Sequence, residues 1–181
     1  YAFNTSKAPL DDLRVRQALS LAIDRQDLID NVLKGGQGPA WFFTRPEMVA
    51  APLQGDYPDL ALGGDDQAAN DAAAQELMNS YLEDNGGEIA TIILGHNESE
   101  SHAAIASAIQ EMWAETFGDA LSVEIQTQEW AVYLDTRRED ETAFPIYRLG
   151  WCYDYTDAHN WLWDVWNSEV RNNAIGPALD G

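Results

Sequence analysis

The chain has 181 residues, with 31 Asp plus Glu against 10 Lys plus Arg, so its net charge is −21. This acidity argues against nucleic acid or anionic lipid as a partner, because both require clustered cations and the ten here are scattered. An apolar share of 45% excludes disorder by composition and suffices for a core. No apolar run approaches the roughly 18 residues of a membrane span, so direct membrane insertion is not expected.

The first half of the chain predicts two long helices separated by a loop. The expected elements are a strand at 1–4, a helix at 11–33, a long ordered loop with several prolines at 38–64 and a helix at 65–84. Each helix begins at a pair of aspartates, whose carboxylates favour the positive end of the helix dipole. Paired glycines follow each helix and are typical of a helix end.

The second half predicts a strand–helix–strand unit followed by a short helix and a strand. The expected ranges are 89–94, 99–117, 121–126, 130–138 and 144–149. The continuous apolar run at 89–94 is typical of a strand covered on both faces, and such a unit has parallel strands with a right-handed crossover. The sequence therefore predicts an α/β fold with a mixed or parallel sheet and helices on both faces.

The tryptophans and the single cysteine carry further expectations. Trp113 lies on an apolar helix face and is assigned to the core, whereas Trp161, Trp163 and Trp166 are too dense for one helical face, so some should be exposed. Cys152 is either a small buried hydrophobe or half of a disulfide with a partner outside the chain. Because the chain opens in a strand and stops in a loop, we expect residues 1–181 to form a single domain of a larger protein.

Three stretches carry a family resemblance: Lys7–Leu19 continuing through Ala22–Arg25, His96–His102, and Gln128–Trp130 followed by Leu134–Arg137 and Arg148–Tyr155. In this order they resemble the third domain of the extracytoplasmic peptide-binding proteins of ABC importers, the oligopeptide and dipeptide permease family. The resemblance implies one lobe of a bilobal periplasmic-binding-protein type II fold. Such lobes close around a ligand by hinge motion.

The resemblance implies that Asp154 pairs with the free α-amino group of a bound peptide, through charge-assisted hydrogen bonds. The alternative for Asp154 is a loop-capping or solvated carboxylate. Trp151 and Trp130 would line side-chain pockets, or else belong to the core. Gly150 and Cys152 flank Trp151 on a segment along which the peptide backbone would pair like an added strand.

Four further residues match ligand positions of the family. Arg148, Arg137 and His102 correspond to residues that meet the peptide's carboxylate, and a guanidinium can clamp a carboxylate with two hydrogen bonds. The alternatives are salt bridges with acidic neighbours for the arginines, and a surface or capping role for His102. Asn172 is also expected to face the cleft.

The function that this resemblance implies is peptide capture for import, without catalysis and without a cofactor. The expected place is outside the cytoplasmic membrane, in the periplasm or on the cell surface as a lipid-anchored protein. The expected partners are a peptide, the other lobe of the parent protein and the membrane permease of an ABC importer.

Three alternatives stay open. The same fold could hold an oligosaccharide or another non-peptide solute, since some members of this superfamily bind sugars or nickel complexes. Glu129 and Asp135 could form the carboxylate pair of a hydrolase, and His96 and His102 could contribute to a metal site. A nucleophile elbow, a nucleotide-phosphate loop and a Cys/His nucleophile pair are all missing from the sequence, which disfavours the enzyme.

Overall fold

The computed structural model describes residues 1–40, 42–45, 47–49, 51, 62–87, 89–138 and 143–167. In these ranges a four-stranded sheet has the order β1-β4-β2-β3. Its strands are β1 (Ala2–Phe3), β2 (Ile92–Asn97), β3 (Val123–Gln128) and β4 (Ile146–Tyr147). β2 is parallel to both β3 and β4, and β1 is antiparallel to β4. The predicted mixed α/β fold is confirmed.

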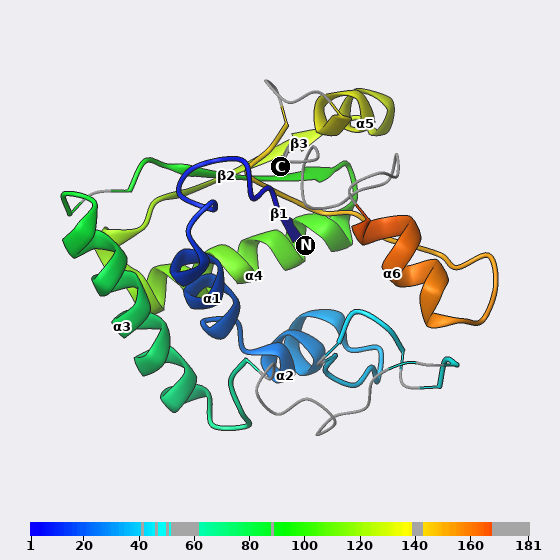
Figure 1. Cartoon of the computed structure of the whole chain (residues 1–181), viewed down its shortest axis with the longest axis horizontal. Helices are drawn as coiled ribbons and strands as arrows, with labels where there is room; N and C mark the ends of the chain where they lie inside the picture. Colours follow the sequence, from blue (N-terminus) through cyan, green and yellow to red (C-terminus); the bar gives the residue numbers. More distant parts are fainter. Residues whose placement is uncertain are drawn as a thin grey trace.

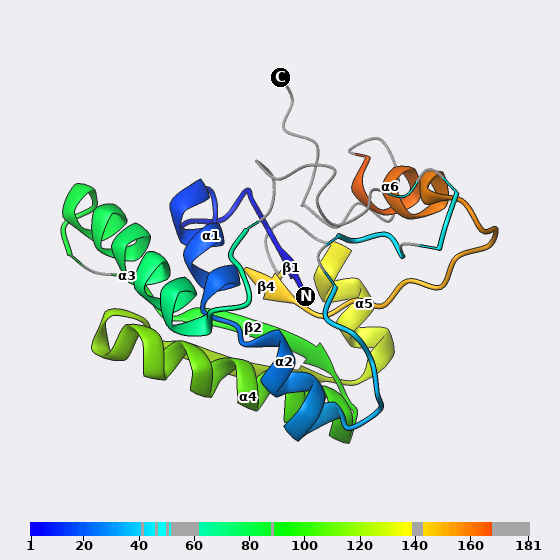
Figure 2. The same ribbon diagram turned by 90° about the horizontal axis from the view of Figure 1, so that it is seen from below.

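Helices make up most of the remaining structure. They are α1 (Leu13–Leu21), α2 (Arg25–Asp27) with a π-helical continuation (Leu28–Leu33), α3 (Gln67–Asp84), α4 (Glu100–Phe117), α5 (Trp130–Arg138) and α6 (Ala158–Trp166). α3 and α6 lie at opposite ends of the molecule (Figure 1). α4 connects the parallel strands β2 and β3 and runs alongside β2 (Figure 2), so the predicted strand–helix–strand unit is confirmed.

Strand alternation places a core on each face of the sheet. Ile92, Leu94 and Ile146 belong to the larger cluster, to which α1, α3 and α4 contribute buried side chains including Val15, Leu19, Met78, Ile109 and Trp113. Ile93 and Tyr147 alternate with them and belong to a smaller cluster that contains Tyr133, Phe144 and Val165. Because Tyr133 lies on α5 and Val165 on α6, helices cover both faces as predicted.

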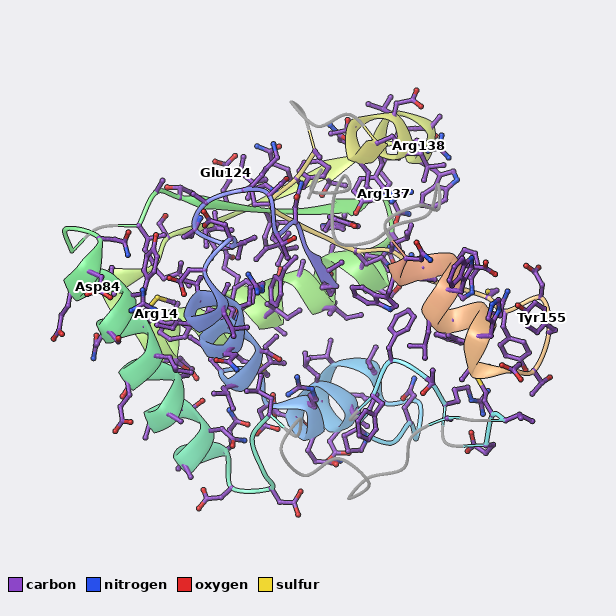
Figure 3. The ribbon with its side chains drawn as sticks, in the orientation of Figure 1. Arg14, Asp84, Glu124, Arg137, Arg138 and Tyr155 are labelled. Atoms are coloured by element: carbon purple, nitrogen blue, oxygen red, sulfur yellow. The ribbon has the colours of Figure 1, made fainter. Side chains whose placement is uncertain are left out.

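The aspartate signals correctly predicted the starts of α1 and α3. The Asp12 carboxylate accepts a hydrogen bond from the Arg14 N–H at 2.8 Å, and Asp66 accepts one from Ala69 at 3.2 Å. The Arg14 guanidinium also lies 2.8 Å from Asp12 and 2.6 Å from Asp84, which ties α1 to α3 (Figure 3). The hydrogen bond from the Arg14 side chain holds the pKa of Asp12 below its usual value.

The prediction of one uninterrupted helix over 11–33 is wrong. Asp24 takes an extended conformation and its carboxylate accepts the Asp27 N–H at 2.9 Å, so it caps a second helix. A side chain that bonds the backbone locally in this way competes with continued helix. The segment ends at Lys34, which adopts the left-handed conformation with φ of 53°, one residue before the paired glycines.

The strands β2 and β4 differ from their predicted extents. β2 continues to Asn97 because its polar end stays in register with β3, and His96 is buried with its Nε2 3.1 Å from Thr127 Oγ1. β4 is confined to Ile146–Tyr147 rather than spanning 144–149.

The expectations for Trp113 and for the three tryptophans at 161–166 are confirmed, although α6 itself was not predicted. Trp113 is 2% exposed and its indole N–H donates to the Leu19 carbonyl at 2.8 Å. On α6, Trp163 is 48% exposed, whereas Trp161 and Trp166 are half-buried and pack edge-on against Phe43 with ring centroids 5.1 and 5.0 Å apart.

Candidate functional site

The carboxyl ends of β2, β3 and β4 meet at one edge of the sheet, because these strands run parallel. Open α/β sheets bind ligands outside such an edge. His102 lies in the first turn of α4, which follows β2, and Trp130 is the first residue of α5, which follows β3. Arg148 directly follows β4 and leads into the segment that carries Asp154. The topology thus gathers candidates that are distant in the sequence.

Tyr133, which the sequence reasoning missed, links these elements. Its hydroxyl donates to the Arg148 carbonyl at 2.6 Å and lies 3.1 Å from the Gly95 carbonyl. Its ring stacks on Trp130 and on Phe144, with centroids 6.3 and 5.6 Å apart. Burial raises the pKa of the Tyr133 hydroxyl above its ordinary value, so the group stays protonated and can donate. Tyr133 follows Trp130 by three residues and so lies on the same helical face, and this spacing is the sequence pattern that could have identified it.

Gly95 allows the close packing beneath this edge. Its carbonyl accepts the Arg148 backbone N–H at 3.0 Å, and a Cβ at this position would overlap the Phe144 ring. Glycine is therefore required for the ring to lie on the strand. Gly95 fixes where the chain leaves β4, and with it the start of the segment 148–157.

Arg148, Arg137 and His102 have no carboxylate partner in the part of the chain that the structure describes. The ion pairs found there are formed by other cations, namely Arg14, Arg45 and Arg138. Arg137 lies near the end of α5 (Figure 3), and its guanidinium carbon is 5.8 Å from the centroid of the Tyr147 ring. Burial, together with the positive charge of Arg148, lowers the pKa of His102 and favours its neutral form. The salt-bridge alternative for Arg148 and Arg137 is thus not observed among these residues.

Four side chains at this edge hold buried polar atoms without a hydrogen-bond partner among the described residues. These atoms are Asn97 Oδ1, His102 Nδ1, Gln128 Oε1 and Arg137 Nε. Buried polar atoms are nearly always bonded in folded proteins, so four together are unusual. Two of them belong to the last residues of β2 and β3, which are register partners. Polar atoms without a hydrogen-bond partner are available to bond a polar ligand, so this edge is a candidate binding site.

The segment after β4 presents the remaining candidates. The Arg148 guanidinium lies against Gly150, where a Cβ would be 2.9 Å from Nη2. Trp151 is half-buried against the smaller core, and Cys152 is exposed and free, so its interpretation as a buried hydrophobe is wrong. Asp154 is exposed, and its carboxylate forms no hydrogen bond or ion pair with the residues that the structure describes.

The two carboxylates of the alternative hydrolase site belong to α5 and its N-terminal cap. The Glu129 carboxylate accepts the Ala131 N–H at 2.8 Å and caps α5, and Asp135 lies 4.0 Å from Arg138 on the exposed side of that helix. Within the described ranges no three side chains of His, Cys, Asp or Glu gather as metal ligands. Asn172, the last predicted cleft residue, lies outside the described residues.

The sequence profile of the bacterial extracellular solute-binding proteins, family 5 (middle region), matches residues 1–173. The chain belongs to this family. It is 34% identical to the oligopeptide-binding protein OppA of Bacillus subtilis over 183 residues, which cover 97% of this chain and 31% of OppA. It is 35% identical to the periplasmic murein peptide-binding protein MppA of Escherichia coli over 164 residues, 90% of this chain and 28% of MppA. The chain therefore spans less than a third of these relatives.

Solved structures agree with this assignment. The murein tripeptide-binding protein MppA of Escherichia coli superposes with a TM-score of 0.79 at 32% identity, over 96% of this chain and 32% of its own. Haemophilus influenzae OppA in complex with RPPGFSPFR gives a TM-score of 0.78 at 26% identity, over 97% and 33%. The predicted type II solute-binding fold is confirmed. Among the described helices none has the length and apolarity to cross a membrane.

Proposed function

We propose that this chain is the peptide-binding lobe of a larger binding protein that captures peptides outside the cytoplasmic membrane for an ABC importer. The observation that carries the proposal is the pairing of opposite, unneutralised charges on one segment. Asp154 offers a free carboxylate and Arg148 a guanidinium without a carboxylate partner among the described residues, in a chain that holds 31 acidic residues. A peptide, with an ammonium at one end and a carboxylate at the other, complements this arrangement.

Each candidate then has a distinct task. Asp154 receives the peptide ammonium through charge-assisted hydrogen bonds. Arg148, Arg137 and His102 receive the carboxylate end, and the chosen cation depends on peptide length. A ligand at this edge would also meet the four unpartnered polar atoms.

The aromatic and backbone groups would supply affinity without reading the peptide sequence. Trp151 and Trp130 offer apolar walls for side chains, and Trp130 is 45% exposed at the start of α5. Gly150 and Cys152 would present backbone groups to an extended peptide, and Asn172 would face the cleft from outside the described ranges.

The relatives supply the wider setting of the proposal. Residues 1–181 would be one lobe, with the other lobe and a membrane permease as partners, working without catalysis in the periplasm or on the cell surface. Relatives from Salmonella typhimurium, Escherichia coli and Haemophilus influenzae are named as periplasmic oligopeptide-binding proteins.

The ammonium contact is tested by calorimetry on the full-length protein with a short peptide and its N-acetylated form. Wild type is expected to prefer the free amine by about ten- to hundredfold, that is by about 1.4 to 2.8 kcal/mol. Asp154→Asn should bind both forms alike, because the neutral amide cannot balance the ammonium charge. Asp119→Asn, which changes another exposed aspartate just beyond the far end of α4, serves as the matched control. An unchanged preference in Asp154→Asn would refute the contact.

A non-peptide solute is the second candidate. One relative, 31% identical over 90% of this chain and 28% of its own, is named the probable deoxycholate-binding periplasmic protein YgiS of Escherichia coli. Native mass spectrometry of the full-length protein, purified without added ligand, separates the two candidates. Co-purified peptides would support the proposal, whereas a bound sterol acid or sugar would overturn it.

A further inference from the structure

Asn160 lies in the first turn of α6 and is completely buried, with 0% exposure. Its Oδ1 accepts two hydrogen bonds from the segment 148–157, one from the Trp151 indole N–H at 3.2 Å and one from the Asp154 backbone N–H at 3.1 Å. Its Nδ2 donates to the Asp164 carboxylate at 2.6 Å. One side chain thus holds both the aromatic wall and the carboxylate that the proposed function places against the peptide.

The chemistry of the three partners fixes the orientation of this amide. Indole and backbone N–H groups only donate and an ionised carboxylate only accepts, so Oδ1 and Nδ2 cannot exchange places. Asn160 and Asp164 are four residues apart on α6 and therefore share a helix face. The negative charge of the Asp164 carboxylate strengthens the hydrogen bond that Nδ2 donates to it. The same charge polarises the Asn160 amide, so Oδ1 becomes a stronger acceptor than that of an amide without this partner.

We infer that Asn160 is a positioning residue that sets the Trp151–Asp154 turn for ligand binding. The inference rests on the proposed function, since it assigns no separate ligand. Asp154 is exposed, and its carboxylate has no bond of its own to described residues, so the place of that carboxylate depends on how its backbone is held. A turn held before the ligand arrives spares the cost of ordering it on binding.

The decisive variant is Asn160→Asp. It keeps the shape of the side chain and an oxygen that faces Trp151 and Asp154, but it replaces the donor Nδ2 with a carboxylate oxygen that faces the Asp164 carboxylate. Two facing carboxylates repel unless they share a proton, and the proton is taken up as the pH falls. In the full-length protein, peptide affinity at about pH 8 should fall by about ten- to hundredfold and approach that of wild type near pH 5. Wild type at both pH values is the reference, because every other pH-dependent group is the same in the two proteins.

Exchanging the two groups provides a rescue. In the double variant Asn160→Asp/Asp164→Asn the donor and the acceptor trade places, while an oxygen still faces Trp151 and Asp154. Affinity should return to within about threefold of wild type, and its pH dependence should match wild type. A residue that only fills space would not respond to this exchange.

The chain offers a matched control. Asn31 donates to Asp27 with the same four-residue spacing on an exposed helical turn. Asn31→Asp makes the same change in charge and also places two carboxylates opposite each other, those of residues 31 and 27, but away from the carboxyl edge of the sheet and the segment 148–157. It should leave peptide affinity unchanged at both pH values.

The indole N–H resonance of Trp151 in the NMR spectrum gives a readout that needs no ligand. It is identified by its loss in Trp151→Phe, and it should shift in Asn160→Asp and return in the double variant. The Trp113 indole resonance reports whether the fold is intact. If Asn160→Asp does not fold, Asp164→Asn gives a second measurement. It removes the charge that polarises the Asn160 amide, so the bond from the Trp151 indole weakens and its N–H resonance should move upfield.

The outcomes separate the two proposals. If wild type binds peptides and Asn160→Asp binds them equally at about pH 8, Asn160 has no positioning role. If wild type binds no peptide, the proposed function fails, and the Trp151 resonance still decides the inference. A resonance that moves and is rescued supports it, and a resonance that stays in place overturns it.

Discussion

Two regions of the molecule differ in how completely their buried polar atoms are hydrogen-bonded. Where α4 packs against α1 and β3, buried and half-buried polar side chains donate to backbone carbonyls: the Trp113 indole to Leu19 at 2.8 Å and the Gln110 amide to Val123 at 2.7 Å. At the carboxyl edge of the sheet and around α6, buried polar atoms lack partners among the described residues. They belong to Thr44, Asn97, His102, Gln128, Arg137, Trp161 and Trp166.

This difference indicates a division of tasks. An unbonded buried polar group costs stability, so a region that collects several must be held by a neighbour that collects none. The larger core performs that role, and under the proposed function the carboxyl edge of the sheet keeps its hydrogen-bonding capacity for a ligand. Substitutions in the first region should therefore change the free energy of unfolding, and substitutions in the second should change binding more.

Trp113→Ala is expected to cause the largest loss in the free energy of unfolding. It removes an indole that is 2% exposed together with its bond to Leu19, and should lower the free energy of unfolding by about 3–5 kcal/mol. Trp163→Ala, which truncates an indole that is 48% exposed, should cost within about 0.5 kcal/mol. Urea unfolding of the two variants measures the difference. Equal losses would contradict the division of tasks.

Gly95→Ala comes next in size and acts where the two regions meet. The new methyl group overlaps the Phe144 ring, and such overpacking costs about 1–3 kcal/mol. Because the Gly95 carbonyl also holds the Arg148 N–H, peptide affinity should fall with stability.

Two comparisons sharpen the Gly95 prediction in the same unfolding and binding measurements. Gly38→Ala, at a position with no neighbouring atom within 4 Å, should leave both quantities unchanged. Adding Phe144→Leu to Gly95→Ala should recover part of the loss, because a smaller side chain vacates the space of the ring. No recovery would show that the ring contact is not the cause.

Local signals predicted much of the fold. Asp12 and Asp66 cap their helices because a carboxylate beside free N–H groups acts within a few residues. The break at Asp24 was missed, since the apolar period of the first helix continues across it and only the capping bond interrupts the backbone. The extent of β2 was also missed, because its polar end is fixed by pairing with β3 and not by its own hydrophobicity.

The candidate site was predictable only where a family pattern names residues. That pattern pointed to Asp154, Trp151 and Arg148, but not to the residues that hold them. Tyr133 and Asn160 act through hydrogen bonds that span 15 and 9 positions to Arg148 and Trp151, and no spacing rule selects such partners. In α6 the dense tryptophans also masked the helical period, which hid the place of Asn160.

The smallest expected effect concerns the pH dependence of stability through His102. Burial, followed by the charge of Arg148, lowers its pKa in the folded protein. The unfolded chain therefore takes up the proton first, so stability is lost as the pH falls through the ordinary histidine value of about 6.5. His102→Gln has no imidazole to titrate and should lose less stability between about pH 7.5 and about pH 5.5 than wild type.

Arg148→Gln and a bound peptide sharpen this last comparison. Arg148→Gln removes one cause of the lowered pKa and leaves burial, so its loss on acidification should lie between those of wild type and His102→Gln. A peptide carboxylate beside His102 would favour the imidazolium, so saturating peptide should shrink the loss in wild type but not in His102→Gln. Unfolding curves at both pH values, with and without peptide, measure all of these differences. Equal losses in wild type and His102→Gln would show that His102 does not couple the site edge to stability.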